Sequence, residues 1–157
     1  SKLKTDSRKD ILNNLILSNK LMFGDINEVS NKLDEVDEYY NWIKTTNDSL
    51  FKDLKKQLKD YKNELNDDIK RSEIEKNIMQ IEMTEINATS NYIHESNVLF
   101  EMRNILSIKK KCKHEFKDGK ILFFDTKCLE DWNKAEINLN ESIKNSNLHR
   151  ENSINKE

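Results

Sequence analysis

Two cysteines are the residues with the clearest potential for covalent chemistry. Cys112 and Cys128 are the only cysteines in the chain, and they bracket residues 113–126. An even number of cysteines around one segment favours a disulfide, which would stabilise the fold by about 3 kcal/mol in the chain-entropy model. The alternative is a pair of free thiols in a reducing compartment. We expect the disulfide.

The other reactive side chains do not form a pattern that supports metal binding or catalysis. Structural zinc requires four ligands, and Cys112-Lys113-His114 offers a Cys-x-His pair with Cys128 as the one further soft ligand. Di-metal sites in helical bundles use a Glu-x-x-His motif, which none of the three histidines completes. No glycine-flanked nucleophile is present. We expect a protein that is not an enzyme and has no cofactor and no metal.

A basic segment followed by an apolar tetrapeptide is the candidate contact site. Residues 109–120 contain six lysines and two acidic residues, and residues 121–124 read Ile-Leu-Phe-Phe. Lysines beside apolar side chains are typical of segments that touch an anionic membrane. The alternative is that the apolar residues fold back onto the ends of the helices while the lysines stay solvated. The residues predicted to contact a membrane or a partner protein are Lys113, Lys117, Lys120, Leu122, Phe123 and Phe124.

The composition indicates long helices in a single domain that covers residues 1–157. The chain has 157 residues, no proline and two glycines, whereas β-sandwiches and barrels need frequent turn residues. Its 27 Lys and Arg are nearly balanced by 29 Asp and Glu, giving a net charge of −2, so no basic field favours nucleic acid. The sequence contains no run of 18 apolar residues, so no transmembrane helix is predicted.

Apolar residues at alternating spacings of three and four predict a first long helix over residues 6–44. Gly24 and Asp25 interrupt it, but the spacing continues across them, so we expect one continuous helix. The alternative is a break at which Asp25 caps a new helix. The capping residues at 45–49 predict the first turn. The spaced residues are Leu12, Leu15, Met22, Ile26, Val29, Leu33, Val36, Tyr40 and Ile43.

Three further helices complete the predicted fold. The second covers residues 49–86 and ends in a turn at 87–91, although the spacing also slips at 66–68, where the turn would otherwise lie. The third helix ends near residue 111 and is followed by a loop over residues 113–126. Asp125 with Thr126 can cap the fourth helix, and the tail 145–157 is expected to fray. Short turns imply antiparallel neighbours. We therefore expect an all-α, up-and-down antiparallel four-helix bundle that is a monomer, with a dimeric coiled coil as the alternative.

Polar residues at positions where the helices are expected to contact one another suggest that the bundle is only marginally stable. Asn19 fills a gap in the first row of apolar residues, and in the second row, which includes Leu50, Leu54 and Tyr61, the contact position is either Leu58 or Gln57. A buried polar residue at such a position fixes register at a cost in stability. Asn19 and Gln57 therefore predict a polar core, and the hypothesis follows that the bundle opens to expose apolar faces.

The chain resembles malaria-parasite helical proteins in three features: its bias toward Lys, Asn and Ile, the heptads of residues 12–43 and 50–69, and the paired cysteines near the last helix. Among these, the chain resembles over nearly its whole length the small micronemal proteins of Plasmodium sporozoites that are essential for cell traversal. The resemblance implies a micronemal, then extracellular, non-enzymatic protein that acts on a host cell membrane or a host or parasite protein. It transfers no binding residue. Exported helical domains, which bind cytoskeletal or receptor tails, are a second resemblance, but only Trp42 and Trp132 are available to match their characteristic tryptophans.

Overall fold

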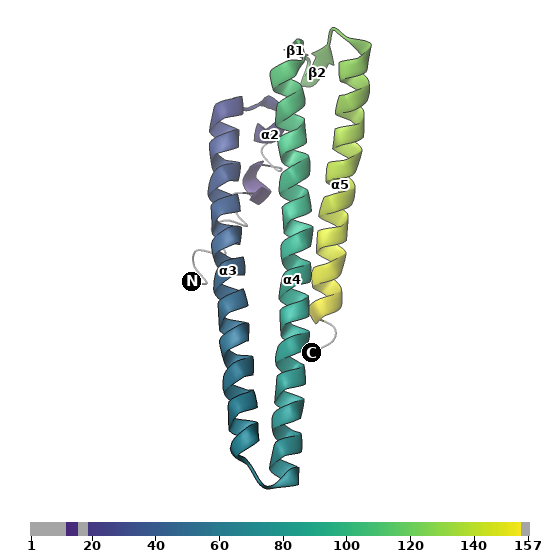
Figure 1. Ribbon diagram of the computed structural model, residues 1–157. Coiled ribbons are helices and arrows are strands. Elements are labelled where there is room, and N and C mark those ends of the chain that lie inside the picture. The colour runs from purple at the N-terminus through teal and green to yellow at the C-terminus, as the bar shows by residue number, and fades with distance from the viewer. Residues whose placement is uncertain (1–11, 16–18, 155–157) are drawn as a thin grey trace. The chain divides into compact units, whose positions relative to one another are not determined.

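The computed structural model describes residues 12–15 and 19–154, with the backbone alone described at 153 and 154, and this part of the chain is mostly helical (Figure 1). The elements in chain order are α2 (Lys20–Phe23), α3 (Ile26–Glu64), α4 (Asp68–Lys111), β1 (His114–Lys117), β2 (Lys120–Phe123) and α5 (Thr126–Ile154). Two compact units divide the chain: unit 1 comprises Ser1–Tyr39 and His94–Glu157, and unit 2 comprises Tyr40–Ile93.

The first helical region is broken at Gly24, so the prediction of one helix over residues 6–44 is wrong. Asn19 has a left-handed backbone with φ of 54°, and Gly24 is extended. The Asp25 carboxylate accepts a hydrogen bond from the Glu28 backbone N–H at 2.9 Å, which is the geometry of an N-cap. The alternative of a break capped by Asp25 is therefore confirmed. Residues 6–11 and 16–18 of the predicted helix lie outside the described residues.

The predicted turn at residues 45–49 does not form, because α3 continues through it to Glu64. The Thr45 hydroxyl donates to the Asn41 carbonyl at 2.9 Å, so this capping residue is satisfied inside the helix. The turn instead follows Glu64, where the Asp67 carboxylate accepts from the Ile69 N–H at 2.9 Å and caps α4. The alternative turn near 66–68 is confirmed, and α4 runs without interruption through the predicted turn at 87–91.

The core of unit 1 is formed by one face of each of three long helical segments, together with Leu15 and Leu21 from the N-terminal part of the chain. Val29, Leu33 and Val36 of α3 are almost fully buried, as are Met102 and Ile105 of α4. The α5 residues that complete this core are Trp132, Ala135 and Leu139. Helix α5 continues to Ile154, so the tail predicted to fray from residue 145 is helical through residue 154, and residues 155–157 lie outside the described part.

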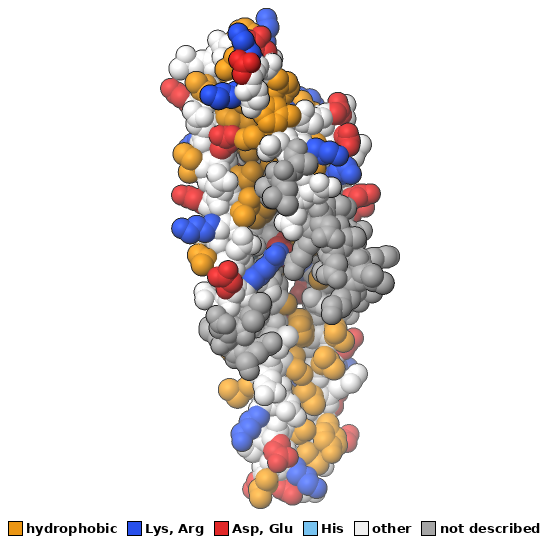
Figure 2. Space-filling model, turned by 180° about the vertical axis from the view of Figure 1, so that it is seen from behind, with side chains coloured by type: hydrophobic (Ala, Val, Ile, Leu, Met, Phe, Trp, Pro, Cys, Tyr) orange, Lys and Arg blue, Asp and Glu red, His pale blue; other side chains and the backbone are white. Residues whose placement is uncertain are grey.

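Unit 2 is a hairpin of two helical segments, residues 40–64 of α3 and 68–93 of α4. Its contacts combine apolar packing, including buried Ile78, with polar pairs such as Lys55–Glu85 and the Tyr92 hydroxyl, which donates to the Asn41 side chain at 2.9 Å. Two helices alone bury little apolar surface, and Figure 2 shows hydrophobic side chains gathered on the surface of this hairpin.

The prediction of a largely helical fold is confirmed, but the predicted set of four long helices is not. Among the described residues there are three long helices, the short α2, the helical residues 12–15 and a β-hairpin. The predicted polar core is wrong, because Asn19 and Gln57 are both exposed. These two residues therefore give no support to the hypothesis that the bundle opens.

Lys109 is a buried cation that donates hydrogen bonds to the backbone at the break between α2 and α3. Its side chain is 3% exposed, and its ammonium donates to the carbonyl oxygens of Leu21 at 3.3 Å and Gly24 at 3.0 Å. Burial lowers the pKa of Lys109 because the charged form loses hydration, while the nearby Asp25 carboxylate opposes this shift.

The lowered pKa of Lys109 predicts a specific pH dependence of stability. Between the folded-state pKa and the ordinary value of 10.5, the unfolded chain holds a proton that the folded chain does not, so the free energy of unfolding rises with pH in this window. We expect the free energy of unfolding of the wild type, measured relative to that of Lys109→Met in urea titrations, to rise with pH on the alkaline side as the pH approaches the ordinary value of 10.5. Lys110→Met, which removes an exposed lysine, is the control; an equal slope for both variants would contradict the assignment.

Candidate functional site

The segment predicted as a loop at 113–126 contains a β-hairpin, so that prediction is wrong. Asp118 and Gly119 connect the two strands with φ of 51° and 71°. Two consecutive left-handed residues form the two-residue turn that matches the twist of paired strands, and Asp-Gly is a preferred sequence for it. Gly119 therefore supplies a backbone conformation that side-chain-bearing residues rarely adopt.

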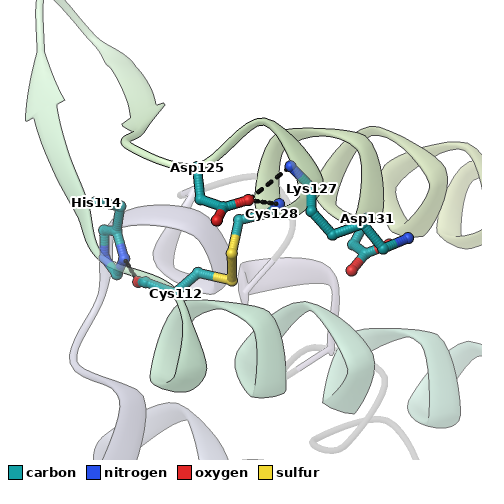
Figure 3. The surroundings of a disulfide bond; sticks show 6 residues. All are labelled: Cys112, His114, Asp125, Lys127, Cys128 and Asp131. Atoms are coloured by element: carbon teal, nitrogen blue, oxygen red, sulfur yellow. Dashed lines mark hydrogen bonds and ion pairs between the residues drawn. A yellow bond between two sulfur atoms is a disulfide. The ribbon is translucent and has the colours of Figure 1, made fainter.

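The hairpin is held at its base by the disulfide between Cys112 and Cys128, as predicted (Figure 3). The two Cα atoms are 6.0 Å apart, within the usual range for a disulfide. The Asp125 carboxylate caps α5 by accepting from the backbone N–H groups of Lys127 at 2.7 Å and Cys128 at 3.3 Å. The bond therefore links the end of α4 to the capped first turn of α5.

His114, at the start of β1, is surrounded by a backbone carbonyl and two aromatic rings. Its Nδ1 lies 2.8 Å from the Cys112 carbonyl oxygen, and its ring lies 5.3 Å from that of Phe116 and 5.8 Å from that of Phe123. In the part of the chain that the structure describes, no group of three or more His, Cys, Asp or Glu side chains could hold a metal ion.

The pairing register of the hairpin sorts its side chains onto two faces. His114 pairs with Phe123 and Phe116 with Ile121, and residues paired across two strands lie on the same face. This face contacts the helices: the Phe123 ring lies 5.2 Å from the Trp132 ring. The Phe116 ring lies 5.2 Å from that of Phe23.

The opposite face points away from the helices, and we call it the outer hairpin face. Glu115 pairs with Leu122 and Lys117 with Lys120, while the Phe124 N–H donates to the Lys113 carbonyl at 3.3 Å and extends the same alternation. The outer hairpin face comprises Lys113, Glu115, Lys117, Lys120, Leu122 and Phe124, all of them exposed.

Five of the six predicted contact residues therefore lie together on the outer hairpin face. The Lys113 ammonium lies 5.2 Å from the centre of the Phe124 ring, within the range of a cation–π interaction. Phe124 is 63% exposed. Phe123 is the exception, because strand alternation turns it inward against Trp132.

Two features of this region do not follow from the spacing and charge of its residues. Phe116 is half exposed at the hairpin tip although it belongs to the inward face. Lys109 was counted with the basic segment, yet it is buried. The Asp-Gly dipeptide between two short runs with apolar residues is the signal that would have predicted the hairpin and its two faces.

The disulfide predicts a measurable gain in stability. We expect the unfolded, unreduced protein to contain no titratable thiol, and Cys112→Ser with Cys128→Ser to lower the free energy of unfolding by about 3 kcal/mol, because the bond restricts the unfolded chain. Thiol titration and urea unfolding measure the two effects. Reducing the wild type should reproduce the double variant; two reactive thiols in the unreduced protein would refute the bond.

None of the helices among the described residues is sufficiently long and apolar to cross a membrane. Comparison of the chain with protein-family models, with curated proteins and with solved structures gives no match.

Proposed function

We propose that this protein is a secreted, non-enzymatic contact protein of an apicomplexan parasite that takes part in host cell traversal or invasion by sporozoites. Its outer hairpin face would contact an anionic membrane surface. The observation that carries the contact is the gathering of three lysines with Leu122 and Phe124 on one exposed face. The parasite and the sporozoite stage rest on the resemblance in composition, heptads and paired cysteines.

The chemistry of the outer hairpin face suits weak, lipid-dependent binding. Its three lysines and one glutamate leave a charge of +2, and each cation near an anionic leaflet contributes about 1 kcal/mol. Leu122 and Phe124 add apolar surface that is transferred from water into the interface. Such binding requires anionic lipid and weakens as salt screens the lysines.

The rigidity of the hairpin supports the same proposal. The disulfide and the Asp118-Gly119 turn hold the face in place before any contact forms. A surface that is already ordered loses less conformational entropy on binding. The disulfide is also compatible with a secreted protein, since such bonds persist in oxidising compartments; an intracellular adaptor would instead keep both thiols reduced.

Co-sedimentation with vesicles tests the membrane contact. We expect the full chain to pellet with phosphatidylserine-containing vesicles and to stay in solution with pure phosphatidylcholine. Lys117→Glu with Lys120→Glu should reduce the binding constant at least tenfold, because each reversal replaces an attraction worth about 1 kcal/mol by a repulsion. Leu122→Ser with Phe124→Ser should also weaken binding, by loss of apolar contact.

Lys52→Glu with Lys56→Glu is the matched control, because it makes the same change in net charge at exposed positions of α3. This control should keep most of the binding. Equal recovery with both kinds of vesicle, or equal loss in both charge-reversed variants, would contradict the proposed contact through the outer hairpin face.

A further inference from the structure

A row of exposed apolar side chains runs along α4 within unit 2. Large apolar residues here are 52% to 75% exposed, although the solvent-facing side of a helix is normally polar. An exposed apolar row bordered by polar residues marks an interaction surface. The exposed residues are Ile69, Met79, Met83, Ile86 and Ile93.

The spacing of this row is that of a coiled-coil contact line. Positions 69, 72, 76, 79, 83, 86, 90 and 93 alternate in steps of three and four, which is the a/d pattern of a helix that packs against another helix. The row is completed by Ser72, Lys76 and Ser90. We call these eight positions the outer α4 stripe.

The outer α4 stripe is distinct from the row through which α4 packs on α3 in unit 2. That inner row has the same spacing and includes Ile74, Ile78, Ile81 and Tyr92, which are buried or half-buried. With 3.6 residues per turn, the two rows lie roughly 150° apart around the helix. Helix α4 therefore carries one contact line that packs on α3 and a second whose large apolar side chains are exposed.

The charges that flank the stripe indicate what would cover it. Four flanking positions between 68 and 89 are acidic and the others are uncharged: Asp68, Glu73, Glu75, Gln80, Glu82, Asn87 and Thr89. Glu75 forms an ion pair with Lys62 of α3, so the negative charge offered to a partner comes from Asp68, Glu73 and Glu82. Flanking positions of a coiled coil select partners by charge. A second copy would place acidic or uncharged flanks against the same residues in either orientation, so no attractive pair would form.

We propose that the outer α4 stripe binds a basic amphipathic helix of another protein. This helix has apolar residues at three- and four-residue spacing, Lys or Arg at the positions that face the acidic flanks, and one acidic residue opposite Lys76. A single charged residue in the contact line fixes the register of such a pair. The inference rests on unit 2 and is independent of the membrane contact proposed for the hairpin.

A synthetic peptide of about four heptads is the probe. It carries Leu at the contact positions, Lys at the flanking positions and Glu at its central contact position, and a second peptide carries Glu in place of the flanking Lys. Fluorescence anisotropy with the full, disulfide-bonded chain should show binding of the Lys peptide at least about tenfold tighter than that of the Glu peptide, because only the first complements the acidic flanks.

Two sets of variants locate the binding. Met83→Gln with Ile86→Gln should weaken it at least about tenfold, and both side chains are already exposed, so circular dichroism should show an unchanged fold. Leu50→Gln with Leu54→Gln, which removes exposed apolar side chains from α3, is the control and should bind normally. Lys76→Glu should weaken binding, and a peptide with Lys at its central contact position should restore it.

Three results would overturn the inference. The first is no binding of the Lys peptide at about 100 μM, a concentration that already corresponds to weak association on the affinity scale. The second is equal binding of the two peptides, or binding that Met83→Gln with Ile86→Gln leaves unchanged. The third is a dimer in sedimentation equilibrium that this double variant abolishes, which would assign the stripe to a second copy.

Discussion

The packing of α4 on α3 is the interaction on which the rest of the structure depends. The inner row of α4 continues from Ile78 in unit 2 to Met102 in unit 1, where the side chains become fully buried. In unit 1, α5 adds Trp132 and Leu139 to this core, whereas unit 2 is limited to the two helices. The difference in apolar burial between the units follows directly from the number of helices in each.

Three- and four-residue spacing predicted the helices but not which side of each helix faces inward. The row with Leu50, Leu54 and Tyr61 was predicted to be a core, yet these side chains are exposed. Phe51, outside that row, is half-buried, and so is Leu58, one of the two alternatives for a contact position in it. Both rows satisfy the same periodicity, so spacing alone could not choose between them. Burial depends on which helix lies opposite, and that depends on where the turns fall.

The turns were predicted less well because polar residues have two local uses. Thr45 could cap a helix or bond the carbonyl four residues earlier, and it does the second. The apolar spacing continues across Gly24, so periodicity did not indicate the break there. In the structure the break consists of an extended Gly24 followed by the Asp25 cap of α3. The cysteine pair was predictable because two cysteines allow one intramolecular pairing. The site residues were found as a segment, but strand alternation was needed to separate Phe123 from its neighbours.

The position of the disulfide has a consequence for proteolysis. The exposed turn at Asp118 and Gly119 lies between the two bonded cysteines, and exposed turns are preferred sites of cleavage. A protease that cut the chain there would produce two fragments still joined by the Cys112–Cys128 bond. The nicked protein would keep its mass on a non-reducing gel and separate into two bands only after reduction, and the outer hairpin face would be divided while the helices on either side stayed linked.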